Sequence, residues 1–256
     1  MQNTQLSIFD SSEVIISTPN NIIQFPTSNS HPNRHPQQRV SPIRDPELVN
    51  QIYNTLLSSG RHGLRNATIF ALQLAIGRRT NDMLHMTMST VYDYTQHTVK
   101  SKITVDEHKT GKTARDLPLP QKTRQLLANY IYTLKNKSPN ALLFPSQKRN
   151  PDGSQRPLNT ASLDYIYQTY TSQLFSSEDE QTHITSYAAR KTYGHNIYTE
   201  CMKNHNGFLP GTDINALQYV QSVFNHESSN ITLRYIGAYD TPANELAESI
   251  QDKYDF

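Results

Sequence analysis

The sequence has little that would suit it to an oxidising compartment or to a membrane. Cys201 is its single cysteine, which excludes an intrachain disulfide framework and makes a reducing compartment the default. The most apolar window, Ala67 to Ile76, is about ten residues long and contains Gln73, whereas a membrane span needs roughly 20 apolar residues. The N-terminus lacks a basic stretch followed by an apolar run, so no secretory signal is predicted. We therefore expect a cytoplasmic protein without a membrane partner.

Apolar residues are also scarce, since they make up only 35% of the 256 residues. The shortage is concentrated at the N-terminal end, where Asn, Gln, Ser, Thr and Pro dominate and residues 28–38 include no apolar side chain. Such a stretch cannot bury enough apolar surface to offset its ordering entropy. The sequence predicts that residues 1–43 form a disordered or linker-like arm and that the folded domain covers residues 44–256.

The chain lacks a large excess of either charge, since its net charge is only +2. This total conceals an asymmetry along the sequence. Residues 1–60 carry three basic and four acidic side chains, residues 61–156 carry 16 and six, and residues 157–256 carry five and 12. The middle segment is therefore at +10 and the last at −7. A basic segment of this size favours a polyanionic partner, although a solvated basic face would give the same count.

Periodicity after residue 43 is mainly helical. Asp45-Pro46-Glu47 has the form of a helix start, and Gly77 ends a second helix that begins near Leu64. Residues 101–106 and 114–119 alternate apolar and polar side chains around a turn, as in an antiparallel hairpin. Further helices are expected at residues 121–135, 159–175, 185–202, 213–224 and 229–235, with a tail helix within residues 236–256. The fold class is α+β, mostly helical with a small antiparallel sheet.

Four separated segments place polar side chains on helix faces or turns. These are residues 77–82, a hairpin turn with Lys109, residues 186–192 and residues 225–235. Taken singly, each has an ordinary explanation; a surface ion pair would account for Arg79 and Asp82, and an exposed turn for Lys109. The histidines have no spacing typical of a zinc site, so we expect neither a metal nor a cofactor.

Together and in this order, the segments resemble the catalytic domain of the tyrosine recombinase (phage integrase) family. Gly77 to Asp82 is similar to the family's Gly-x-Arg-x-x-Glu/Asp box, which implies that Arg79 is the first catalytic arginine and Asp82 its supporting carboxylate. The Lys-Thr-Gly-Lys turn resembles the family's hairpin lysine, which falls on Lys109.

The second half of the resemblance lies in the last two segments. Residues 187–190 resemble the His-x-x-Arg box, which implies that Arg190 is the second arginine, with Tyr187 where most members have His. His226 and Tyr235 have the family's usual nine-residue separation, and Asn225 replaces the usual Gly before the histidine. The arm is too short and too polar to be the family's core-binding domain, so the chain resembles a member with the catalytic domain only.

The chemistry of these residues fits phosphoryl transfer. A tyrosine can conserve the energy of a phosphodiester as a covalent ester, and two guanidinium forks match the oxygens of the phosphate. Lysine and histidine side chains can move the protons, and positioning with electrostatics needs no metal or ATP. Weaker DNA contacts are assigned to Arg78, Lys112, Lys148, Arg149 and Lys191.

The resemblance implies a site-specific recombinase that cuts and rejoins DNA through a 3′-phosphotyrosyl intermediate at Tyr235. The implied partners are duplex DNA with an inverted-repeat core site, three further copies of the chain in a homotetramer, and an accessory DNA-bending or DNA-binding factor. The setting would be the bacterial nucleoid, with the gene on a chromosome, phage or plasmid. Two alternatives are a type IB topoisomerase-like nicking-closing enzyme and a non-catalytic DNA-binding regulator that keeps the fold.

Overall fold

The computed structural model describes residues 40–108, 111, 113–176 and 183–238, together with the backbone of two strands near the N-terminus. The side chains of Ala114 and Arg115 are outside this description. Lys109, Lys112 and the predicted tail helix beyond residue 238 also lie outside the described residues, as does most of the predicted arm. The chain divides into two compact units, Met1–Arg39 and Val40–Phe256.

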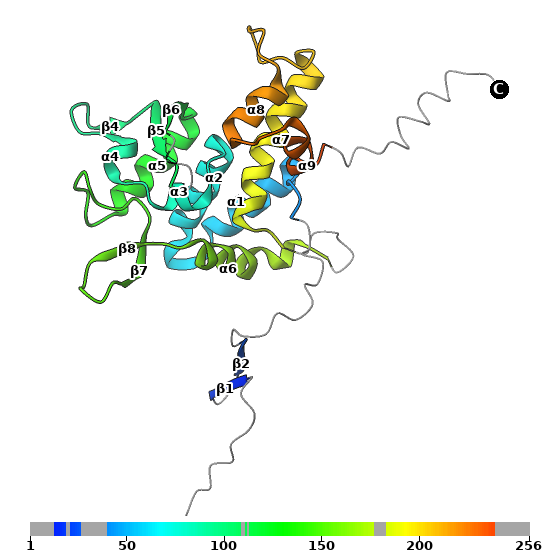
Figure 1. Ribbon diagram of the computed structural model, residues 1–256. Helices are drawn as coiled ribbons and strands as arrows, with labels where there is room; N and C mark the ends of the chain where they lie inside the picture. The colour runs from blue at the N-terminus through cyan, green and yellow to red at the C-terminus, as the bar shows by residue number, and fades with distance from the viewer. Residues whose placement is uncertain are drawn as a thin grey trace, which may run out of the picture. The chain divides into compact units, whose positions relative to one another are not determined.

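The second unit is built mainly from helices (Figure 1). In chain order its helical elements are α1 Pro46–Leu57, η1 Gly60–His62, α2 Gly63–Ile76, α3 Thr80–Leu84, α4 Met88–Val91, α5 Gln121–Thr133, α6 Thr160–Thr171, η2 Ser172–Leu174, α7 Ser186–Asn204, α8 Ala216–Phe224 and α9 Ser229–Tyr235. The predicted helix start is confirmed, because the Asp45 carboxylate caps α1 by accepting from the backbone N–H of Glu47 at 2.9 Å.

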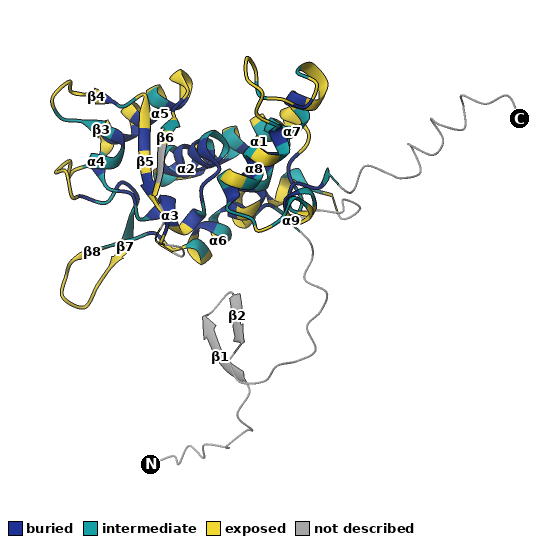
Figure 2. Ribbon diagram, turned by 45° about the horizontal axis from the view of Figure 1, so that its top comes forward, coloured by how far each residue is buried: buried dark blue, intermediate teal, exposed yellow. Residues whose placement is uncertain are grey.

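Strands in the described residues occur as two-stranded antiparallel pairs. The strands are β1 Glu13–Thr18, β2 Asn21–Pro26, β3 Tyr92–Asp93, β4 Thr98–Val99, β5 Lys102–Asp106, β6 Thr113–Pro118, β7 Pro145–Arg149 and β8 Gln155–Pro157. The predicted hairpin is β5–β6, in which Ile103 lies opposite Leu117. Ile103 and Val105 are buried and their neighbours exposed, which is the predicted alternation (Figure 2). The α+β, mostly helical fold class is confirmed.

The main core forms around α2, whose surface is covered on nearly all sides (Figure 2). This explains why the most apolar window of the sequence falls in that helix. Residues of α1, α5, α6 and α7 pack with α2 in a single cluster that includes Leu56, Phe70, Leu127, Tyr167 and Ala188. Because α2 is packed on nearly all sides, the residues at both of its ends are held in fixed positions.

A second, smaller cluster joins α7, α8 and α9, which lie together on one side of the unit (Figure 1). Val220, Phe224 and Ile236 form its buried centre. Gly194 on α7 permits the close approach of α8, because a Cβ at this position would lie 2.7 Å from the Phe224 ring. This cluster holds the last predicted segment, residues 225–235, against α7.

The chain enters the domain before the predicted boundary at residue 44. Ile43 is buried in the main core, and its backbone N–H donates to the Thr192 hydroxyl at 2.8 Å. Lys191 donates from Nζ to the Val40 carbonyl at 2.6 Å. Residues 40–43, which the composition assigned to the arm, thus pack along α7.

Candidate active site

The junction between α2 and α3 presents two adjacent arginines. Gly77 ends α2 in the left-handed conformation at φ 57°, and a Cβ at this position would lie 2.1 Å from the Tyr193 ring. Both demands require glycine, since the turn needs a positive φ and the packing leaves no room for a side chain. Arg78 is consequently buried, whereas Arg79 keeps a quarter of its side chain exposed.

Glu107, which directly follows β5, pairs with both arginines. Its Oε1 lies 3.1 Å from Nη1 of Arg78, and its Oε2 accepts from Nη1 of Arg79. Arg79 therefore pairs with Glu107 rather than with Asp82, the partner expected from the sequence. The sequence showed Glu107 only as one of six acidic residues in the basic segment, two positions before Lys109.

Asp82 instead binds the residue that precedes Lys109. Its Oδ1 accepts from the backbone N–H of His108 at 3.0 Å and lies 3.3 Å from the Nδ1 atom of the His108 ring. The contact joins the first turn of α3 to the segment just after β5, immediately before Lys109 in the sequence. Asp82 therefore contacts His108, whereas the ion pair of Arg79 is made by Glu107.

The first turns of α7 carry Tyr187 and Arg190. Arg190 is 4% exposed; its Nη2 donates to the Phe224 carbonyl at 3.3 Å, and its guanidinium carbon lies 4.5 Å from the Phe224 ring centroid. Burial lowers the pKa of Arg190. Tyr187 is 54% exposed, yet it lies near enough to Tyr235 to contribute to that residue's raised pKa.

His226 follows a left-handed turn at Asn225. Asn225 ends α8 in the left-handed conformation at φ 55°, and asparagine is among the few non-glycine residues that tolerate it. The substitution of Asn for the more usual Gly therefore preserves the turn. Burial, followed by the nearby charges of Arg190 and Arg79, lowers the pKa of His226 to about 4, so the ring is neutral at pH 7.

The hydrogen bonds of Thr232 determine which ring nitrogen of His226 carries the proton. Thr232 Oγ1 donates to the Ser228 carbonyl at 3.3 Å and lies 3.1 Å from Nδ1 of His226. Because its hydrogen is already used, Oγ1 accepts from Nδ1–H, which leaves Nε2 of the neutral ring as an acceptor. Thr232 was included in the sequence pattern, but this orienting function was not predicted.

Tyr235 lies at the end of α9 with its ring 4.9 Å from the His226 ring and 5.1 Å from the Phe224 ring. Burial raises the pKa of its hydroxyl, and the Arg190 guanidinium opposes this shift. Lys191, predicted to contact DNA, lies 5.0 Å from the centroid of the Tyr235 ring while its Nζ binds Val40. The phenol is thus held neutral beside a permanent positive charge.

Several buried polar atoms of this cluster lack a partner. Within the described residues these include Nε and Nη2 of Arg78 and Nη1 of Arg190, and the Tyr235 hydroxyl lies beside the Arg190 guanidinium. A buried N–H group without an acceptor costs roughly 1–3 kcal/mol, and more when the group is charged. Several such donors converging on one site leave it suited to an anion with several oxygen atoms, such as a phosphate.

From inside the core, Gln73 connects α3, which Arg79 precedes, to α7, which carries Arg190. Its Nε2 donates to Thr80 Oγ1 at 3.1 Å and to the Ser186 carbonyl at 3.4 Å, and its Oε1 accepts from the Tyr167 hydroxyl at 2.7 Å. Thr80 follows Arg79, and Ser186 begins the helix that carries Arg190. The sequence signal was available, since Gln73 is the only amide side chain in the most apolar window.

The other predicted positions lie elsewhere or outside the described residues. Lys148 and Arg149 belong to β7 and are exposed, with Arg149 Nη1 donating to the Gly153 carbonyl at 2.8 Å. Lys109 and Lys112 lie outside the described residues. Among the described residues there is no group of three potential metal ligands and no helix long and apolar enough to cross a membrane.

Comparison with known families assigns the chain. The model of the phage integrase family matches residues 44–241, which is most of the sequence. The chain belongs to the phage integrase family. No curated protein matches this integrase-family chain in sequence.

Solved structures of recombinases share its fold. XerH site-specific recombinase, bound to a palindromic difH substrate in a post-cleavage complex, superposes with a TM-score of 0.54 at 18% identity over 83% of this chain and 53% of that protein. XerA recombinase gives 0.52 at 14% identity over 84% and 66%. The Tn1549 transposon integrase, bound to transposon right-end DNA, gives 0.50 at 13% identity over 84% and 66%.

This integrase-family chain thus spans about half to two thirds of the length of those proteins. At these identities the likeness shows the fold, which is the tyrosine-recombinase-like catalytic fold expected from the sequence. In this chain Arg79 precedes α3, Arg190 lies on α7, His226 follows α8 and Tyr235 ends α9.

Proposed function

We propose that this chain is a site-specific DNA strand transferase that uses Tyr235 as its nucleophile. The observation that carries the proposal is the buried Tyr235 hydroxyl beside the Arg190 guanidinium, together with unpartnered N–H groups on Arg78 and Arg190. A phosphodiester in this site would accept hydrogen bonds from the arginines and present its phosphorus atom to the phenol oxygen. Family membership supports the same assignment.

In the cleavage step, one bond to phosphorus forms as another breaks, and each proton has a donor and an acceptor. The Tyr235 phenol oxygen attacks the phosphorus atom, the bond from phosphorus to the 5′ oxygen breaks, and a 3′-phosphotyrosyl ester forms. The phenol proton passes to Nε2 of His226, which is the free acceptor of the neutral ring. The departing 5′ oxygen takes a proton from Lys109, the function that the family resemblance implies for this residue.

The arginines stabilise the charge that develops during this step. Arg79 and Arg190 face the non-bridging oxygens, and Glu107 holds Arg79 and Arg78 in position. Because the phosphotyrosyl ester retains the bond energy, a free 5′ hydroxyl can reverse the reaction on a second strand without ATP or a metal. Tyr187 remains a proposed accessory residue at the edge of the site.

The proposed substrate is duplex DNA with an inverted-repeat core site, bound by four copies of the chain, with an accessory DNA-bending or DNA-binding factor. The XerH and Tn1549 integrase structures are complexes with DNA, which supports DNA as the partner. The proposed setting is the cytoplasm, at the nucleoid.

The test is covalent trapping on nicked suicide duplexes, which lose a short 5′ fragment and so cannot religate. The duplexes would carry inverted repeats taken from the DNA beside the gene. Each half-site would be about one helical turn long. The wild-type chain is expected to form an adduct that survives denaturing electrophoresis, and Tyr235→Phe none. Tyr198→Phe is the matched control, because Tyr198 packs in the same small cluster and loses the same hydroxyl. An adduct with Tyr235→Phe would refute the assignment of the nucleophile.

A further inference from the structure

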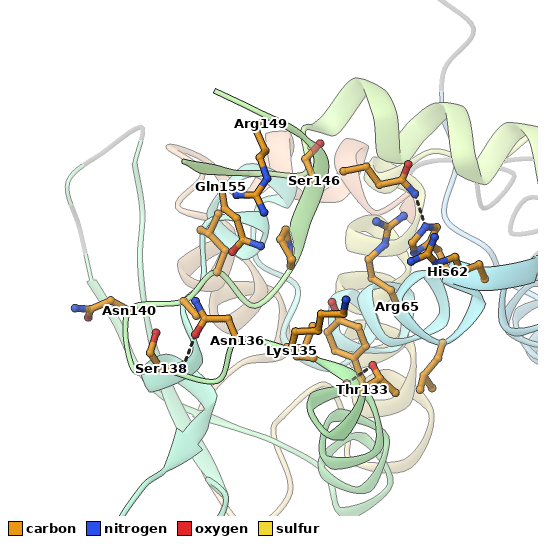
Figure 3. A pocket seen from close by; sticks show the side chains of 18 residues that line it. His62, Arg65, Thr133, Lys135, Asn136, Ser138, Asn140, Ser146, Arg149 and Gln155 are labelled. Atoms are coloured by element: carbon orange, nitrogen blue, oxygen red, sulfur yellow. Dashed lines mark hydrogen bonds between the residues drawn. The ribbon is translucent and has the colours of Figure 1, made fainter. Parts of the chain in front are cut away.

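A large pocket lies at the opposite end of α2 from the candidate active site. It has a volume of about 820 Å³ and is formed by the start of α2, the segment after α5 and the hairpin β7–β8. Arg65, Lys135 and Arg149 surround the same hollow, one from each of these elements (Figure 3). None of the catalytic candidates among the described residues lines it.

The lining of the pocket is strongly one-sided in charge. Four permanently basic side chains contribute to it, namely Arg61, Arg65, Lys135 and Arg149, together with His62. No aspartate or glutamate is among the described residues that line it. All of the lining residues fall within residues 61–156, the segment with a net charge of +10.

Arg65 is the best-formed anion donor of this group. It is 8% exposed and, within the described residues, pairs with no carboxylate; its Nε and Nη2 donate to Asn66 Oδ1 at 3.3 and 3.1 Å. Asn66 is itself fixed, because its Nδ2 donates to the Ser59 hydroxyl at 3.0 Å. A buried guanidinium without a countercharge is costly, and an anion in the pocket would offset that cost.

The opposite wall of the pocket is held in place by a side-chain contact. Gln147 Nε2 on β7 contacts His62 Nε2 in η1, so the hairpin that carries Arg149 is joined to the start of α2. The pKa of His62 is lowered by burial and by the neighbouring Arg65 and Arg61, so its ring is less readily protonated than a free histidine. The permanent charges of the pocket are therefore those of the arginines and the lysine.

The separation from the active site rules out a single phosphate that serves both places. Arg65 and Arg79 are 14 residues apart along and just beyond α2, which corresponds to about 20 Å at 1.5 Å per residue. Along B-form DNA, at about 3.4 Å per base pair, that distance is roughly six base pairs. The volume also exceeds what one phosphate would fill, so an extended ligand is favoured.

We propose that this pocket is a second phosphate-binding site, in which Arg65, Lys135 and Arg149 bind phosphate groups other than the one that reacts. The favoured source is the backbone of the DNA duplex several base pairs from the cleavage position. That source rests on the proposed function, whereas the phosphate chemistry of the pocket does not. The other source is a free phosphorylated molecule such as a nucleoside triphosphate.

The test measures binding with the full-length Tyr235→Phe chain, so that no step depends on cleavage. Fluorescence anisotropy with a labelled duplex is followed over a range of salt concentrations, with Lys135→Gln/Arg149→Gln added on the same background. Both residues are exposed, so the protein is expected to stay folded. Lys203→Gln/Lys122→Gln is the matched control, because it removes the same charge from exposed positions outside the pocket.

Loss of two phosphate contacts is expected to weaken duplex binding about tenfold near 0.1 M salt, equally for any sequence, and to reduce the salt slope by about 1.8. The control pair should leave the slope within about 0.5 of the parent value. Arg65→Lys, which keeps the charge but loses the fork, is expected to weaken binding without a change in slope.

A parallel arm titrates ATP and pyrophosphate into the same variants by calorimetry. Pocket-dependent binding of these ligands, with duplex affinity unchanged, supports the phosphate site and assigns it to a free ligand. If the pocket variants change neither duplex nor ATP and pyrophosphate binding, the inference is overturned. If wild-type protein forms no covalent adduct but the pocket variants still lose duplex affinity, only the proposed function fails.

Discussion

At the scale of single residues, the arginine pair of the α2–α3 junction depends on one carboxylate. Glu107 is 5% exposed and is the acceptor for Nη1 of both Arg78 and Arg79. Two adjacent guanidinium groups repel each other, and burial lowers the pKa of Arg78. In the absence of a bound phosphate, the Glu107 carboxylate is therefore the countercharge that offsets the repulsion between the two guanidinium groups.

We predict that Glu107→Gln lowers the free energy of unfolding by about 3 kcal/mol, because it leaves two guanidinium groups near the protein interior without a countercharge. The measurement is urea denaturation of the full chain. Asp106→Asn is the matched control, since Asp106 is exposed and bonds to Thr113 at the surface, and it should cost less than about 1 kcal/mol. Phosphate or sulfate should restore part of the loss in Glu107→Gln; equal costs for the two variants would contradict the prediction.

His226 gives a pH prediction with a definite sign. Its pKa is about 4 in the folded chain and near 6.5 when unfolded, so between these values the unfolded chain binds more protons and stability falls as the pH is lowered. The ring is half-buried, so screening reduces the expected effect to about 1–2 kcal/mol. His226→Gln should lose correspondingly less stability between pH 7 and pH 4.5 in urea denaturation. An identical loss in both proteins would show that His226 is not the group responsible.

At the scale of secondary-structure elements, one arginine comes from the junction before α3 and the other from α7, and these two elements must keep a fixed relative position. Arg79 precedes α3 and Arg190 lies on α7, and Gln73 bonds to the first residue of each helix while Tyr167 fixes the Gln73 amide. These bonds are buried, where an unsatisfied group is costly. The geometry of the active site is therefore set partly from within the core.

We predict that Gln73→Leu destabilises the chain by about 2 kcal/mol and slows adduct formation. The double variant Gln73→Leu/Tyr167→Phe should recover part of the stability, because it also removes the hydroxyl left without an acceptor. It should not recover the rate of adduct formation, since the bonds to Thr80 and Ser186 remain absent. If the rate recovers together with the stability, Gln73 has no positioning function.

At the same scale, the sequence predicted regular elements better than it predicted their partners. Helix starts and ends follow from local chemistry, as with the Asp45 cap and the left-handed turns at Gly77 and Asn225. The short pairs β3–β4 and β7–β8 were missed, because their strands are too short or too polar for a period of two to be visible. The pairing of Arg79 with Glu107 joins residues 28 positions apart, and local spacing favoured the nearer Asp82.

At the scale of the whole molecule, the asymmetry of charge acquires a spatial meaning. The basic segment contributes Arg79 at one end of α2 and the whole lining of the large pocket at the other end. The acidic segment contributes Arg190, His226 and Tyr235, which reach the site through α7, α8 and α9. A net charge of +2 therefore hides two cationic regions about 20 Å apart along one helix.

The sequence by itself determined the residue types, their order and the local turns, and these identified the family and the members of the candidate site. Hydrogen-bond capacity and backbone preference are properties of short segments, so they can be read without a fold. Only the tertiary structure decided that Glu107 pairs with Arg79, that Gln73 joins two helices and that Arg65 lies in a basic pocket. Those facts depend on which segments, distant in the sequence, pack together in the protein interior. There, burial makes each unpaired polar group unfavourable in free energy.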